Sequence, residues 1–239
     1  MTGKLFAQAM LKFFAGVVLV GALIFLPAGT WNYGNGWLLM GLLFLLPVVT
    51  GLGAGMGLLF VPMFLAGLVM MAKNPRLLES RLDAKEKLAE QSLVVKLSGL
   101  MFLLGFVTAG LGVRFGWYML PRGVVIAAAA AFLLAYVLYA EVLRENTYLS
   151  RTIEVQQGQK VIDTGLYGIV RHPMYSATLL LFLSMPLVLG SVYAFVIFLA
   201  YPLIIAKRIR GEEAFLEENL EGYRAYKEKV RYRLIPFVW

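Results

Sequence analysis

The sequence has no cysteine and a single histidine, His172, among its 239 residues. Without cysteine, the chain can form no disulfide and can offer neither a thiolate metal ligand nor a cysteine nucleophile. A metal centre built from several imidazoles is excluded as well, and we predict no metal site. Charged residues are also few, at 15% of the chain. The chemistry of the protein must therefore come from a small number of polar stretches.

Apolar residues make up 60% of the chain, and its mean hydropathy is +0.77. A folded domain in water cannot leave so much apolar surface exposed without aggregating. We therefore predict an integral membrane protein, all-α, folded as a polytopic transmembrane helical bundle of about seven spans. The formal charge of +8 does not indicate nucleic-acid binding, because the basic residues cluster in the connecting segments and the tail.

The first half of the chain predicts three membrane helices. The first is centred on Phe13–Leu26. The apolar run from Trp37 to Ala72 would rise about 54 Å as one helix, against a hydrocarbon core of roughly 30 Å, so we expect it to turn. The glycines of residues 51–57 suit that turn, and they do not fit the dinucleotide fingerprint GxGxxG. The charged segment 73–90 is either an amphipathic helix on the membrane surface or a solvated loop.

The second half predicts two single helices and a helical hairpin. The single spans are Leu93–Val113 and Gly123–Leu143. The apolar run Met174–Tyr201 is expected to break at Pro186 and Gly190 into two short arms. The charged tail that follows is predicted to form a helix against the protein or the membrane face. Its apolar side chains at near-helical spacing are Phe215, Leu216, Leu220, Tyr223 and Val230.

The basic residues predict the orientation of the bundle. With seven crossings, residues 73–96, 144–171 and 207–233 share one side and hold 18 of the 22 lysines and arginines. The positive-inside rule then places these segments in the cytoplasm. Two lysines near the N-terminus would fall on the opposite side, which counts against this number of crossings.

The polar stretch 163–175, DTGLYGIVRHPMY, holds His172 at the start of the hairpin. A polar cluster at the mouth of a membrane helix is costly unless it binds something, although basic residues there also contact lipid headgroups. Because the hairpin returns to the same side, Glu212 and Glu213 at its exit are predicted to lie near the histidine. These carboxylates could form a surface salt bridge with neighbouring arginines, or they could hold a cationic ligand.

An ordered set of motifs in the last hundred residues resembles a known family. The motifs are Gly165–Tyr175 with its RHPxY sequence, the apolar hairpin, Arg208-x-x-x-Glu212-Glu213, and Gly222-Tyr223-x-x-Tyr226. Together they resemble the isoprenylcysteine carboxyl methyltransferase family, and Glu145–Tyr148 is similar to its bacterial branch. The resemblance covers roughly residues 140–239. We accordingly divide the chain into N-terminal transmembrane helices, 1–122, and a catalytic transmembrane core with a C-terminal helix, 123–239.

The resemblance implies an integral membrane enzyme that uses S-adenosylmethionine without a Rossmann domain. The distribution of the basic residues predicts that its cofactor site faces the cytoplasm. Arg208 corresponds to an arginine that faces the methyl acceptor, a prenylated cysteine or a similar lipophilic acid that enters from the bilayer. By motif position, the residues implied at the cofactor site are Gln159, Lys160, Val161, Ile162, Tyr167, His172, Pro173, Met174, Tyr175, Glu212 and Glu213.

Other functions fit parts of the same pattern. A carboxylate acceptor is already ionised at pH 7 and needs no base, whereas an amine or thiol acceptor would need one, with Glu213 or Tyr175 as candidates. Enzymes that methylate phosphatidylethanolamine and sterol-reductase-like proteins share parts of the C-terminal motifs, so a phospholipid methyltransferase and a nicotinamide-dependent reductase stay open. A transporter or scaffold is disfavoured because the predicted spans contain almost no interior charge.

Overall fold

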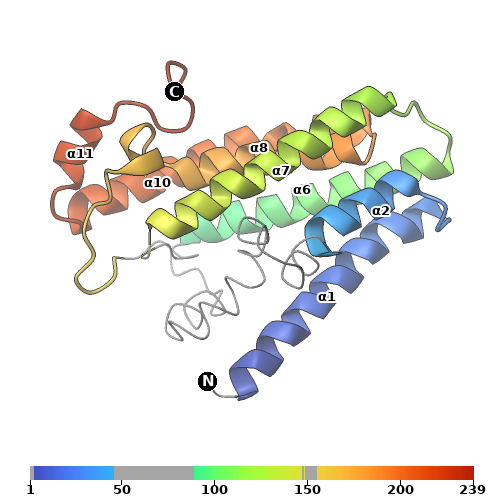
Figure 1. Ribbon diagram of the computed structural model, residues 1–239, viewed down its shortest axis with the longest axis horizontal. Helices are drawn as coiled ribbons and strands as arrows, with labels where there is room; N and C mark the ends of the chain where they lie inside the picture. Colours follow the sequence, from blue (N-terminus) through green and yellow to red (C-terminus); the bar gives the residue numbers. More distant parts are fainter. Residues whose placement is uncertain (1–2, 46–88, 147, 149–154) are drawn as a thin grey trace, which may run out of the picture.

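The computed structural model describes residues 3–45, 89–146, 148 and 155–239. Within them the chain is helical, and its sole β feature is an isolated bridge between Met119 and Ser191. The helices are α1 (Gly3–Ala28), α2 (Gly34–Met40), the π-helix η1 (Gly41–Leu45), α6 (Ala89–Arg114), α7 (Arg122–Glu145), the 3-10 helix η2 (Gly165–Gly168), α8 (Pro173–Val188), α9 (Val192–Phe198), α10 (Ala200–Asn219) and α11 (Tyr223–Lys229). The predicted all-α bundle is confirmed (Figure 1).

Three stretches of the described chain are long and apolar enough to cross a membrane: Ser92–Arg114, Arg122–Glu145 and Val192–Asn219. Phe13–Ala28, Gly34–Phe44 and Pro173–Val188 are shorter apolar helices. The predicted spans at 93–113 and 123–143 therefore match α6 and α7. The third predicted span and most of the charged segment 73–90 lie outside the described residues, so the number of crossings stays a prediction.

The helical hairpin differs from its prediction in two ways. Pro186 lies inside α8 rather than breaking it, and the chain turns at Gly190, whose φ of +75° is in the left-handed region that favours glycine. The returning arm is also long rather than short, because α9 and α10 follow each other from Val192 to Asn219. The same arm thus runs from the apolar bundle into the charged tail, and it carries Arg208 and the two glutamates.

The predicted tail helix is likewise divided. α10 ends at Asn219, and Gly222 takes a φ of +84° before α11 begins. This reversal folds α11 back onto the segment before α8, where Leu220, Tyr223, Tyr226 and Val230 form a small apolar cluster of their own. An uninterrupted helix would have carried these side chains away from that segment.

The main hydrophobic core is continuous across the bundle, from Ile24 in α1 to Ile209 in α10. Small residues allow the helices to approach closely, as is typical of membrane interfaces. At Gly110 of α6, a Cβ atom would lie 2.5 Å from the backbone oxygen of Ile24 in α1. The division of the chain at residue 122 stays a prediction, since one core joins both parts.

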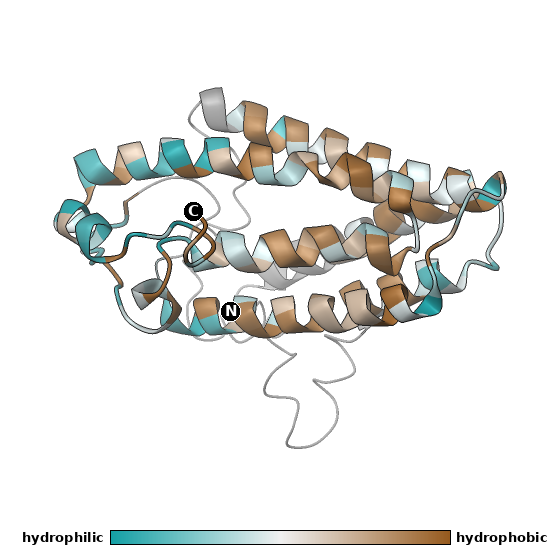
Figure 2. Ribbon diagram, turned by 90° about the horizontal axis from the view of Figure 1, so that it is seen from above, coloured by the Kyte–Doolittle hydropathy of each residue, from teal (hydrophilic) through white to brown (hydrophobic). Residues whose placement is uncertain are grey.

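The two ends of the bundle differ in polarity. Hydrophilic residues gather at the end that holds α11, η2 and the C-terminal half of α10, whereas the middle of the bundle is mostly hydrophobic (Figure 2). At the opposite end, the α6–α7 loop is fastened to the hairpin turn, because the backbone N–H of Leu120 donates to the Gly190 carbonyl at 2.8 Å. This contrast is expected of a bundle whose middle lies in lipid.

Candidate active site

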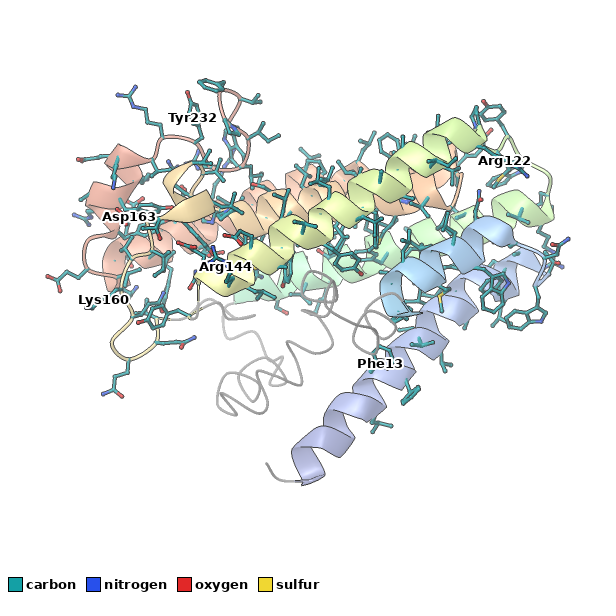
Figure 3. All side chains as sticks on the ribbon, in the orientation of Figure 1. Phe13, Arg122, Arg144, Lys160, Asp163 and Tyr232 are labelled. Carbon is teal, nitrogen blue, oxygen red and sulfur yellow. The ribbon has the colours of Figure 1, made fainter. Side chains whose placement is uncertain are left out.

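A cavity opens at the hydrophilic end, between the segment before α8, the start of α8, the face of α10 and α11. Its empty volume is about 850 Å³, including its mouth. The residues that line it are Asn146, Tyr148, Gln159, Lys160, Val161, Ile162, Tyr167, Arg171, His172, Met174, Tyr175, Arg208, Glu212, Leu216, Leu220, Tyr223 and Tyr226. Figure 3 shows Arg144, Lys160 and Asp163 at this end of the molecule and Arg122 at the other.

One face of α10 forms a wall of the cavity. Arg208, Glu212 and Leu216 of α10 line it, together with Leu220 directly after the helix, and the four follow one another at intervals of four residues. Side chains at this spacing stack along one side of a helix, over a length of about 18 Å for twelve residues. The wall is therefore charged at the end near the bundle and apolar at the end near α11.

Tyr175, in the first turns of α8, connects the two charged residues of this wall. Its hydroxyl donates to Oε2 of Glu212 at 2.6 Å and accepts from Nε of Arg208 at 2.9 Å. The tyrosine is buried, and its ring lies roughly parallel to the His172 imidazole at 5.7 Å between centroids. The start of α8 thus places an aromatic hydroxyl between a cation and a carboxylate.

Glu213 has a different position from the one that the motif implied, since it does not line the cavity. Its buried carboxylate accepts from Nε of Arg171 at 2.7 Å and from Nε of Arg233 at 2.9 Å, and Nε2 of His172 lies 3.3 Å away. The neighbouring residue Pro173 also lies outside the lining, where it occupies the first turn of α8. These contacts make Glu213 a structural link between α10, the histidine stretch and the C-terminal segment.

Arg171 completes this link. Its guanidinium also donates to the carbonyls of Val230 and Arg231, at 2.7 and 2.8 Å. The backbone N–H groups of Arg171 and His172 donate to the carbonyls of Tyr232 and Arg233, both at 2.9 Å. The C-terminal segment therefore holds the histidine stretch in place from behind the cavity.

Tyrosines from the loop and from α11 close the remaining wall. Tyr167 accepts a hydrogen bond from Asn146 at 2.9 Å, and burial raises the pKa of its hydroxyl to about 12. The hydroxyl of Tyr226 donates to the Tyr167 carbonyl at 2.8 Å. Burial, with the nearby carboxylates of Glu213 and Glu212, holds the pKa of Tyr223 far above its usual range. All three phenols are neutral at physiological pH.

Ten of the twelve residues implied at the site come together around this cavity, and Pro173 and Glu213 do not. Seven further residues of the lining were not predicted at the site: Asn146, Tyr148, Arg171, Leu216, Leu220, Tyr223 and Tyr226. Most of them belong to segments that carried the family resemblance, the Glu145–Tyr148 run and the Gly222–Tyr226 motif. Membership of those motifs could therefore have predicted that these residues also line the site. Among the described residues no group of acidic side chains and histidine could hold a metal ion.

Comparison with known proteins finds that parts of the chain are similar to a methyltransferase family and to a sterol reductase. Residues 122–222 match the model of the phospholipid methyltransferase family. The Delta(14)-sterol reductase TM7SF2 of Mus musculus is 30% identical over 92 residues, which are 37% of this chain and 22% of that protein, so the match spans about a fifth of the relative. The structure of the eukaryotic intramembrane Ras methyltransferase ICMT aligns over 97% of this chain and 86% of its own, at 17% identity and a TM-score of 0.49.

The family-model match overlaps the region of the sequence resemblance over residues 140–222, and it includes the whole of α7, α8, α9 and α10. It ends before Tyr223 and Tyr226. It confirms the predicted likeness to membrane methyltransferases in this part of the chain. The matched family and the resemblance differ in the acceptor that they suggest, a phospholipid in one case and a prenylated cysteine in the other.

Proposed function

We propose that this integral membrane protein transfers a methyl group from S-adenosylmethionine to the carboxylate of a prenylated cysteine or a similar lipophilic acid. The observation that carries the proposal is the bonding of Tyr175 to both Arg208 and Glu212 on the wall of one cavity. Arg208, which would bind the methyl acceptor, and Glu212, which would bind the methyl donor, are thereby held at a fixed spacing. Positioning of this kind supplies much of the acceleration that a displacement reaction needs.

The lining of the cavity suits the chemical groups of S-adenosylmethionine. This molecule supplies a methyl group on a sulfonium cation, and it also carries an ammonium, a carboxylate and a purine. Glu212 can bind the positive groups, the tyrosine rings near it offer faces that attract a cation, and Leu216 and Leu220 suit the purine. The hydroxyl of Tyr223, a residue of the same wall, is buried and has no hydrogen-bond partner within the described residues.

The charges favour an acid as the methyl acceptor. Arg208 can orient a carboxylate through charge-assisted hydrogen bonds, and an ionised carboxylate needs no base. Of the two candidate bases, Glu213 is paired with Arg171 and Arg233 away from the cavity, and the hydroxyl of Tyr175 already donates to Glu212. Neither group is placed to take a proton from an amine.

A phospholipid amine is the second candidate acceptor, because the matched family model is that of phospholipid methyltransferases. In that case Glu212 would be the candidate base, since it is the carboxylate on the cavity wall. A membrane-embedded acceptor is common to both candidates. We place the cavity on the cytoplasmic side, on the strength of the basic residues that surround it.

The test is binding of radiolabelled S-adenosylmethionine to the detergent-purified chain. Glu212→Gln should weaken binding greatly, while Glu218→Gln, an exposed glutamate on the same helix, should leave it unchanged. His172→Ala should weaken binding as well, and its thermal unfolding must be measured beside it because His172 is buried against Glu213. Normal binding by both the Glu212 and the His172 variants would show that the site is assigned wrongly.

Transfer of the label distinguishes the acceptors. A farnesylcysteine analogue, phosphatidylethanolamine and a small thiol would be offered in parallel to the same preparation. We expect methylation of the farnesylcysteine analogue. Labelling of phosphatidylethanolamine instead would establish the second candidate, and binding without transfer to any acid would contradict the proposed reaction.

A further inference from the structure

Two buried hydroxyl groups in the described part of the chain have no hydrogen-bond partner, those of Tyr136 and Tyr223. Leaving such a group unsatisfied costs about 1–3 kcal/mol, so each one in a native structure calls for an explanation. Tyr136 lies in the middle of α7, in the hydrophobic core of the bundle. Tyr223 lines the cavity, although only 4% of its surface is exposed. The two tyrosines therefore differ in their surroundings: Tyr136 lies in the core, and Tyr223 belongs to the wall of the cavity.

The position of Tyr223 is set by the surrounding backbone and packing. Gly222, with its left-handed φ of +84°, reverses the chain so that α11 begins at Tyr223 itself. The ring packs in the cluster with Leu220 and Tyr226, which places the tyrosine at the apolar end of the α10 wall. Its neighbour Tyr226 donates to the Tyr167 carbonyl and so fastens α11 to the loop. Tyr223 makes no comparable bond, and the fastening does not depend on its hydroxyl.

The wall of the cavity separates two kinds of chemistry. His172, Tyr175, Arg208 and Glu212 supply polar and charged groups near the bundle, whereas Leu216, Leu220 and Tyr223 form the apolar end. A ligand that is charged at one end and flat and weakly polar at the other matches this division. The flat part needs apolar contact on its faces and a hydrogen bond at its edge or at its sugar.

We propose that the Tyr223 hydroxyl is a hydrogen-bonding group for the nucleoside part of the bound methyl donor. This inference rests on the proposed function, because it takes S-adenosylmethionine as the ligand. The phenol is neutral and can donate to a purine nitrogen or a ribose oxygen, and its ring supplies apolar contact to the same part of the ligand. Tyr223 belongs to the Gly222-Tyr223-x-x-Tyr226 motif, but it is not among the residues that the resemblance implied at the cofactor site.

The experiment compares Tyr223→Phe with Tyr136→Phe in the full-length chain in detergent. Each change removes one buried, unpartnered hydroxyl and keeps the ring, so neither should lower the midpoint of thermal unfolding without ligand. Tyr223→Phe should weaken binding of S-adenosylhomocysteine about 3- to 10-fold, the range expected for one hydrogen bond. Tyr136→Phe should leave the Kd unchanged.

Competition by ligand fragments tests the assignment to the nucleoside. Adenosine should compete less well against the labelled ligand in Tyr223→Phe than in the unaltered chain, and methionine should compete equally in both. A reversed pattern would overturn the assignment, as would an unchanged Kd or a lowered unfolding midpoint in Tyr223→Phe. Failure of the unaltered chain to bind S-adenosylmethionine or S-adenosylhomocysteine would overturn the proposed function together with this inference.

Discussion

The hydroxyl of Tyr175 lies between a cation and an anion, and it uses both of its hydrogen-bonding roles there. It accepts from Arg208 and donates to Glu212. Arginine presents several donors in a rigid planar fork, and in Arg208 the one at Nε is the donor to Tyr175. A lysine has the same charge but lacks this geometry.

Arg208→Lys should therefore separate catalysis from donor binding. We expect turnover with a farnesylcysteine analogue to fall by about 10- to 100-fold, the equivalent of roughly one or two charge-assisted bonds. The Kd for S-adenosylmethionine should change by less than about threefold, because Glu212 remains. Arg210→Lys, an exposed arginine on the same helix, is the matched control. Equal losses of binding and turnover would mean that Arg208 has a structural role instead.

Replacement of the buried Glu213 should lower stability, and not only ligand binding. Glu213→Gln leaves Arg171, which is nearly inaccessible to solvent, without its countercharge. Removing one partner of a buried ion pair typically costs 3–5 kcal/mol. We expect a markedly lower midpoint of thermal unfolding in detergent, whereas Glu218→Gln on the exposed side of α10 should leave it unchanged. An unaltered midpoint would show that this ion cluster does not hold the C-terminal segment.

At the scale of the elements, long apolar runs were predicted well and connections poorly. α6 and α7 extend the predicted spans by a few residues, because apolar length fixes where a helix crosses lipid. Pro186 was expected to break the hairpin, but it falls in the last turn of α8 and the reversal occurs at Gly190. Sequence spacing alone could not show that a charged tail continues the returning arm as α10. In the structure α10 packs against both α6 and α8.

The contact between α1 and α6 gives a test at this scale. In Gly110→Ala, the new methyl group would meet the backbone of α1, 2.5 Å from the Ile24 oxygen and 3.0 Å from the Ala28 nitrogen. We expect a loss of stability of about 1–3 kcal/mol from overpacking. Gly99→Ala, on an open part of the same helix, should cause no loss, since nothing lies within 4 Å and alanine favours helix. Unfolding in a denaturing-detergent titration measures both, and similar stabilities would contradict the close approach.

For the whole molecule, the division into a hydrophilic end and an apolar middle followed from composition. The cavity itself did not, because its walls come from four separate segments. The motifs placed Gln159, Tyr167, His172 and Glu212 in it, but no motif distinguishes a glutamate that faces a cavity from its neighbour that faces away. Glu213 lies one position along α10 from Glu212, and the turn of the helix directs it toward Arg171 instead.

The absence of cysteine makes the orientation of the molecule measurable. Phe115 lies in the α6–α7 loop and Glu228 lies on α11, and both are exposed. Each can be replaced by cysteine. Three segments, α7, α8 and the arm α9–α10, separate them, so the two sites should face opposite sides of the membrane. In intact cells an impermeant maleimide should label Phe115→Cys, and Glu228→Cys should react after permeabilisation. Labelling of both variants from one side would contradict the proposed topology.

The hydroxyl of Tyr175 bonds to both Arg208 and Glu212, so it can couple the binding of the methyl donor to the binding of the acceptor. If an acid draws Arg208 toward itself, the bond from Arg208 to Tyr175 weakens, and Tyr175 changes its interaction with Glu212. Affinities at the two subsites are then linked, and linkage is reciprocal: whatever factor the acid imposes on the methyl donor, the donor imposes on the acid. The apparent affinity for each reactant would then depend on the concentration of the other.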